Sequence, residues 1–190
     1  DIEGWNAEGH KGSAEFYSDF GNFDVDITVP SDYTVWSTGR LLNDKNVFSS
    51  RITERLEKAL KSETVVHIIT AIDRNENTMA QPDKKLTWKF KAENQADFAF
   101  AVSNKYIWDA TSVTVGDKKI MVNSVYDPEA EFFNAVNGIS IKSLNYYSKK
   151  SPAIEFPFDQ ITAFHGRRGG MEFPGMINDS DYNNEMETIL

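Results

Sequence analysis

The sequence contains no cysteine among its 190 residues. This absence excludes disulfide frameworks, thiol nucleophiles and cysteine-based zinc sites, and it leaves the redox compartment open. The chain also lacks an apolar run of about 18 residues, the length that a membrane-spanning helix needs. No basic segment followed by an apolar one begins the chain. We therefore expect no obligate contact with a membrane.

Basic residues are fewer than acidic ones, with 20 Lys and Arg against 29 Asp and Glu, and the formal net charge is −9. A chain with this balance repels phosphate backbones and anionic lipid surfaces, so nucleic acid is excluded as the main partner. A peptide, a sugar or a neutral partner stays open. The sequence carries no signal for an oligomeric state.

Histidine is scarce, and His10, His67 and His165 lie far apart without a metal-ligand spacing between them. A metal site built from these three is therefore not expected. His67 lies within an apolar strand pattern, which favours a hydrogen-bonded histidine of the core or surface. The chain has no G-x-S-x-G elbow, P-loop or G-x-G-x-x-G motif, so these nucleophile and phosphate sites are not indicated either.

What is present is enough apolar and aromatic content, 40% and 13%, for a well-packed core. Residues 14–29 alternate apolar and polar, which predicts a half-buried antiparallel strand that ends at Pro30. Its inward side chains are Phe23, Val25, Ile27 and Val29. Residues 33–39 predict a second strand, and together the two favour a hairpin or meander. Residues 49–62 change to a helical period and predict a short amphipathic helix.

The second half of the chain has strand patterns and one long helical pattern. We expect strands over residues 64–73, 85–103 and 156–166, a hairpin over 111–126, a long helix over 128–147 and the start of a helix at 185–190. Residues 96–103 are apolar on both faces of the strand, so we expect them to be buried.

This order of elements indicates a strand-rich α+β fold. Strands with a helical insertion come first and predict an antiparallel β-sheet domain over residues 1–103. A smaller mixed sheet with one long helix follows over residues 104–190.

The segment HGRRGGMEFPGMIND, residues 165–179, is neither helix-like nor strand-like in its pattern. Glu172 lies between Gly170-Met171 and Phe173-Pro174, so a flexible residue precedes it and a stiff one follows. A carboxylate held in this way can bind an ammonium group by charge-assisted hydrogen bonds. The segment can equally be a turn that only connects two elements, and the residues alone leave both interpretations open.

The stretch GGMEFPGMI, residues 169–177, resembles the G-x-M-E-N exopeptidase motif of the aminopeptidase N family of zinc metallopeptidases, which are gluzincins. Its form is similar to that of bacterial members. Residues 15–43 and 88–108 also resemble parts of the family's N-terminal β-domain and of its junction with the catalytic domain. The long helix and the strand FPFDQITAF follow in the family's order.

The resemblance implies a fold and a site. The fold is the latter part of the family's N-terminal β-domain, followed by the small sheet and first helix of a thermolysin-like domain. Glu172 would hold the free α-amine of a peptide substrate, and Gly169, Gly170 and Met171 would line the extended substrate. The family's usual Asn after the motif glutamate is Phe173 here, which makes exopeptidase specificity less secure.

The family's zinc comes from an H-E-x-x-H helix, and this chain contains no such motif. We expect the chain to be an internal fragment that ends just before that helix, with zinc bound in the parent protein. The fragment then holds no catalytic or metal-binding residue, and we expect it to be inactive alone. Asp1 is not a translation start, and we expect the parent to be exported to the periplasm or cell envelope.

Two other function classes remain as alternatives. The first is a non-catalytic peptide-binding or structural module on a peptidase scaffold, in which Glu172 binds a peptide terminus without turnover. The second and weaker one is a carbohydrate-binding β-module, suggested by the tryptophans. These are spread evenly along the chain, as core and strand residues commonly are: Trp5, Trp36, Trp88 and Trp108.

Overall fold

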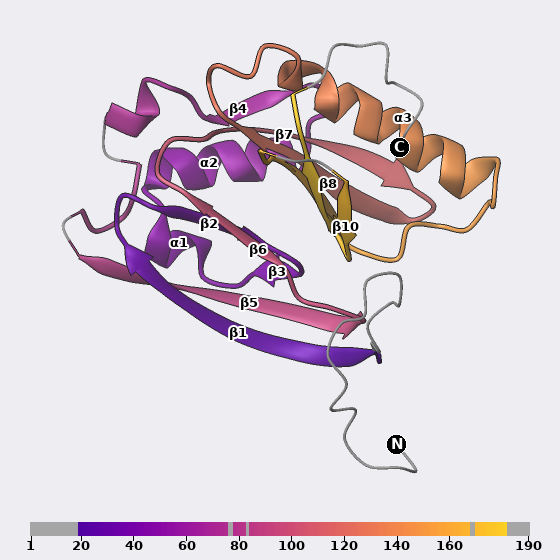
Figure 1. The fold of residues 1–190 in the computed structure, drawn as a ribbon, viewed down its shortest axis with the longest axis horizontal. Coiled ribbons are helices and arrows are strands. Elements are labelled where there is room, and N and C mark those ends of the chain that lie inside the picture. The colour runs from indigo at the N-terminus through magenta and orange to yellow at the C-terminus, as the bar shows by residue number, and fades with distance from the viewer. Residues whose placement is uncertain (1–18, 76–77, 83, 168–169, 182–190) are drawn as a thin grey trace.

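The computed structural model describes residues 19–75, 78–82, 84–167 and 170–181 (Figure 1). The strands are β1 (Gly21–Pro30), β2 (Thr34–Ser37), β3 (Arg40–Leu41), β4 (Val66–Ile69), β5 (Lys85–Gln95), β6 (Phe100–Ser103), β7 (Ile107–Val115), β8 (Lys118–Tyr126), β9 (Gln160–His165), β10 (Met171–Phe173) and β11 (Met176–Asp179). The helices are α1 (Asp44–Val47), α2 (Ser50–Ala59) and α3 (Val136–Lys149), with short 3₁₀ turns at Asp73–Asn75 and Phe133–Ala135. The strand-rich α+β class is confirmed.

The β1 strand alternates between exposed and half-buried residues, as the sequence predicted. The hairpin expected between β1 and the next strand is wrong, because β1 pairs with β5 in the order β1-β5-β3. The pairing places Asp24 opposite Lys91 and Asp26 opposite Lys89, so the acidic outer face of β1 meets the lysines of β5. All four residues of β2 are buried, and β2 forms a separate two-stranded ribbon with β6.

The expectation that residues 96–103 are buried is also wrong. Phe100 and Val102 are 54% and 37% exposed. The β6 strand pairs with β2 alone among the described strands, and its alternate side chains point away from the core. The described part of the chain covers only one face of β6, although the strand is apolar on both.

The largest sheet has six strands in the order β10-β11-β9-β8-β7-β4. It is mixed, because β9 runs parallel to both β8 and β11 while the other pairs are antiparallel. Helix α3 covers one face through Leu144 and Ile141, which pack on the β7–β8 hairpin (Figure 1). The long helix begins later than residue 128, since Asp127 forms a turn with the amides of Glu129 and Ala130.

One apolar cluster joins the two halves of the chain. Trp36 of β2 and Trp108 of β7 meet edge to face at 5.9 Å between ring centroids, and Phe48 contacts Trp108 at 5.9 Å. The β4 strand, from the first half, pairs with β7 of the second. The boundary between residues 103 and 104 remains a prediction, and packing is continuous across it.

In the described part of the chain, no helix has both the length and the apolar content that crossing a membrane requires.

Candidate functional site

The segment that seemed neither helix-like nor strand-like forms a β-hairpin, so that expectation is wrong. Strands β10 and β11 pair antiparallel, with Glu172 opposite Ile177 and Phe173 opposite Met176. Met176 is fully buried and anchors the hairpin, while Gly175 takes the positive φ of 69° that the turn needs. The sequence pattern hid the hairpin because β10 has only three residues.

Strand β10 is the outermost strand of the six-stranded sheet. Among the described strands it pairs with β11 alone, so its other edge is free for an added strand. Gly170 has a φ of 88°, and a Cβ atom built on it would meet nothing within 4 Å. The space over this glycine is therefore open. Such an edge can take up an extended peptide by main-chain hydrogen bonds.

The predicted site residues fall on this edge. Met171 is 51% exposed and Glu172 is exposed, while Gly169 lies outside the described residues. No other described residue forms a hydrogen bond or ion pair with the Glu172 carboxylate. A free carboxylate beside an open strand edge can bind a cationic group at the end of a peptide.

The turn of this hairpin is held by residues that the sequence did not indicate. The Thr38 hydroxyl donates a hydrogen bond to Pro174 O at 2.9 Å, and Thr162 N donates one to Gly175 O at 2.9 Å. Thr38 lies in the corner between β2 and β3, 136 residues from Pro174. The sequence signal that could have pointed to this corner was Gly39, which marks a turn directly after Thr38.

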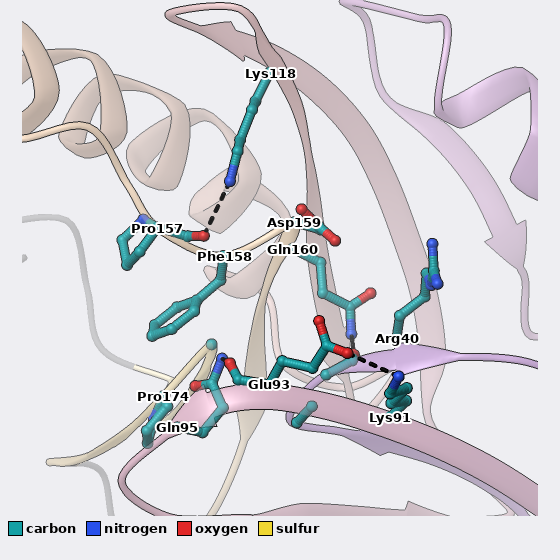
Figure 2. A pocket seen from close by; sticks show the side chains of 13 residues that line it. Arg40, Lys91, Glu93, Gln95, Lys118, Pro157, Phe158, Asp159, Gln160 and Pro174 are labelled. Carbon is teal, nitrogen blue, oxygen red and sulfur yellow. Dashed lines mark hydrogen bonds and ion pairs between the residues drawn. The ribbon is translucent and has the colours of Figure 1, made fainter. Parts of the chain in front are cut away.

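A pocket of about 360 Å³ lies next to the same turn (Figure 2). It is lined by the β2–β3 corner, β5, the start of β8, the segment before β9, and the turn residues Pro174 and Gly175. Its charged side chains are Arg40, Lys91, Glu93, Lys118 and Asp159. Lys91 forms an ion pair with Glu93 at 2.7 Å, and Lys118 donates to Pro157 O at 3.3 Å. Glu172 does not line this pocket, so the pocket is separate from the open strand edge.

Solved structures share this fold, although no family model and no curated protein matches the sequence. A two-domain M1 zinc metallopeptidase variant bound to L-arginine is 14% identical, with a TM-score of 0.54 over 89% of this chain. An M1 zinc metallopeptidase from Deinococcus radiodurans is 15% identical, with a TM-score of 0.52 over 88% of this chain. This chain has the fold of a part of these enzymes.

The shared part is about a third of each M1 structure, because the chain covers 32% of their length. At these identities the likeness concerns the fold. A scaffold of the zinc metallopeptidase type is what the motif resemblance implied.

A zinc ion needs three or four His, Cys, Asp or Glu side chains that converge on one point. No group of three or more His, Cys, Asp or Glu residues that could hold a metal ion occurs in the described ranges. His10 lies outside those ranges, and His67 and His165 lie on β4 and β9, which β8 and β7 separate. The described residues therefore do not fit a zinc site.

His67 instead belongs to a group of hydrogen-bonded side chains at the β4 edge of the six-stranded sheet, opposite β10. Its Nδ1 lies 2.6 Å from Asp109 Oδ1, and the Tyr126 hydroxyl donates to Asp109 Oδ2 at 2.7 Å. Burial, then the hydrogen bond and negative charge of Asp109, raise the pKa of Tyr126 above its usual range. The predicted hydrogen-bonded histidine is confirmed. His67 and Tyr126 together give the buried carboxylate of Asp109 its hydrogen-bond partners.

Proposed function

We propose that this chain is part of a zinc-dependent, aminopeptidase-like metallopeptidase that removes N-terminal residues from peptides. In this proposal Glu172 binds the free α-amine of the substrate, and β10 binds the peptide backbone. The observation that carries the proposal is the exposed Glu172 carboxylate, which has no partner among the described residues and stands on an open strand edge.

The chemistry of this edge suits the end of a peptide. A protonated α-amine has three N–H donors, and an ionised carboxylate accepts such bonds at close range. The backbone of Gly169, Gly170 and Met171 would pair with the substrate next to that amine. Gly170 leaves room there, because a Cβ atom at this position would have no neighbour within 4 Å.

The zinc and the groups that activate water would come from outside the described residues, because those residues do not fit a metal site. We assign no catalytic residue to this chain, and we expect no peptidase activity from it alone. Its own contribution is to bind and orient the substrate.

The test uses Glu172→Gln in the full-length protein, with peptide substrates that carry either a free or an acetylated N-terminus. Removing the charge while keeping the shape should raise KM for the free-amine substrate about tenfold, since a charged hydrogen bond contributes about 1.5–3 kcal/mol. KM for the acetylated substrate should stay the same. Glu54→Gln, on the exposed face of α2, is the matched control and should change neither value. An equal effect of Glu172→Gln on both substrates would refute the amine-binding role.

A peptide-binding module without catalysis is the second candidate, because the open edge and Glu172 can bind a peptide terminus without any metal. The zinc content of the full-length protein separates the two candidates. A full equivalent of zinc supports the metallopeptidase, whereas binding of free-amine peptides without zinc supports the module.

A further inference from the structure

The hydroxyl group of Thr38 can satisfy its two hydrogen bonds in only one way. Thr38 is 1% exposed, and its backbone N donates to Ala99 O at 2.9 Å. The amide of Ala99 lies 3.1 Å from the Thr38 hydroxyl, which must accept there because an N–H can only donate. The single hydroxyl proton is therefore left for Pro174 O, at 2.9 Å.

The corner that carries Thr38 is fixed on both sides. The Gln160 side-chain amide, at the start of β9, donates to Ser37 O at 3.2 Å and also to Gly39 O. Figure 2 shows Gln160 pointing toward this corner from the pocket wall. Gly39 has a φ of 81°, and a Cβ atom there would lie 2.3 Å from Lys91 O. Position 39 therefore requires glycine, and the Gln160 side chain holds the backbone on either side of Thr38.

The β10 strand of this hairpin has few other supports, whereas β11 pairs with β9. The β10 strand has three residues and pairs with β11 alone among the described strands. Glu172 lies two residues before Pro174, so the position of the turn fixes the position of the carboxylate. Met176 and Thr162 hold the β11 side, and Thr38 holds the turn next to β10.

We propose that Thr38 is a positioning residue for the substrate edge. Its hydroxyl ties the turn at Pro174 to the β2–β3 corner and so sets the place of Glu172 against a bound peptide. This inference rests on the proposed function, in which Glu172 binds the substrate amine. A misplacement of about 1 Å in a binding group can cost on the order of a hundredfold in rate, so one hydrogen bond at the turn is enough to matter.

The experiment compares three variants of the full-length protein. Thr38→Val removes the hydroxyl and keeps the shape, while Thr38→Ser keeps the hydroxyl. Thr111→Val is the matched control, because Thr111 is also fully buried and donates to a backbone oxygen, Ser62 O, at 3.0 Å. Two quantities are measured: amide hydrogen exchange over residues 171–178, and KM for free-amine and acetylated substrates.

Thr38→Val should speed exchange in the hairpin at least about tenfold and raise KM for the free-amine substrate about tenfold. Thr38→Ser and Thr111→Val should match the unmodified protein in both measurements. Unchanged exchange or KM in Thr38→Val would overturn the proposal. So would equal damage from Thr38→Ser, or the same changes in Thr111→Val.

The two proposals fail separately. If Glu172→Gln affects free-amine and acetylated substrates equally, the proposed function is lost. The exchange rates of Thr38→Val and Thr38→Ser then decide alone whether Thr38 holds the hairpin.

Discussion

Asp73 is a charged residue inside the protein, with a side chain only 3% exposed. Arg51 and Arg55 of α2 reach its two oxygens at 2.9 and 2.7 Å. Thr70 adds hydrogen bonds from its amide and its hydroxyl, at 2.8 and 2.6 Å. The carboxylate therefore ties α2 to the segment that follows β4, and its charge is compensated where it is buried.

The pKa of Asp73 predicts how this tie responds to acid. Burial acts to raise the pKa, but the hydrogen bonds from Thr70, and the bond and charge of Arg55, outweigh it and hold the pKa below 3.8. A carboxyl group with a lowered folded-state pKa stabilises the protein fully above its unfolded value, about 3.9, and loses that effect as the pH falls through the folded value.

Asp73→Asn should therefore lower the free energy of unfolding at pH 7 by about 3 kcal/mol, since it removes the buried negative charge that Arg51 and Arg55 both face. The difference from the unmodified protein should narrow as the pH falls below about 3.9, where Asp73 of the unfolded chain takes up a proton, and should be lost once the pH is below the lowered pKa of the folded state. Urea unfolding at a series of pH values measures both effects. A difference that stays constant down to about pH 2 would show that the charge of Asp73 is not what stabilises this region.

Single residues stood out in the sequence where their immediate neighbours made them unusual, although the role of Glu172 stays a prediction. Glu172 stood out because glycine precedes it and Phe-Pro follows, and His67 because it interrupts an apolar strand. Thr38 and Asp73 did not stand out, since their partners come from distant positions, such as Pro174 for Thr38. Only the tertiary fold brings these atoms together.

At the scale of elements, the side chain of Asn43 continues a strand. The β3 strand pairs with β5 through Arg40 and Leu41, and Leu42 N still donates to Lys89 O at 2.8 Å. Beyond it the Asn43 amide group donates to Thr87 O at 2.9 Å and accepts from Lys89 N at 3.0 Å. One side chain thus replaces the next backbone pair of the ladder.

Asn43→Ala should cost about 1–3 kcal/mol of stability, because two hydrogen bonds are lost. Both are made to the part of β5 that extends beyond its pairing with β3. Asn43→Asp should be at least as damaging, since its carboxylate would face Thr87 O without a donor. Asn46→Ala, on the exposed side of α1, is the control and should stay within about 0.5 kcal/mol. Urea midpoints measure all three, and equal midpoints for Asn43→Ala and Asn46→Ala would contradict the strand-continuation role.

The elements themselves were predictable where the apolar pattern of a strand or helix runs over enough residues. The alternation in β1, the β7–β8 hairpin and the helix at residues 50–59 follow local rules and are confirmed. Which strands pair was not predictable, because β1 pairs with β5 although strands β2, β3 and β4 and helices α1 and α2 lie between them in the chain. The opposed charges on β1 and β5 account for that pairing only once both strands are placed together.

For the whole molecule, the decisive feature is the aromatic cluster between the two halves. Trp88 and Phe48 meet edge to face at 5.0 Å, and Phe48 also contacts Trp108, which donates from Nε1 to Asn123 Oδ1 at 3.0 Å. Trp88 and Phe48 are almost fully buried. Each half therefore uses aromatic surface of the other to complete its core.

Because the two halves share this core, the protein should unfold in one step. Amides in β1 and β5 and amides in β7 and β8 should lose protection at the same urea concentration, because both halves contribute side chains to one shared apolar cluster. Trp108→Ala should lower the free energy of unfolding by about 3–5 kcal/mol and shift both midpoints together. Phe100→Ala is the control, since Phe100 is 54% exposed and its loss should shift neither midpoint appreciably. Two separate transitions, with Trp108→Ala moving only the second, would instead establish independent domains on either side of residue 103.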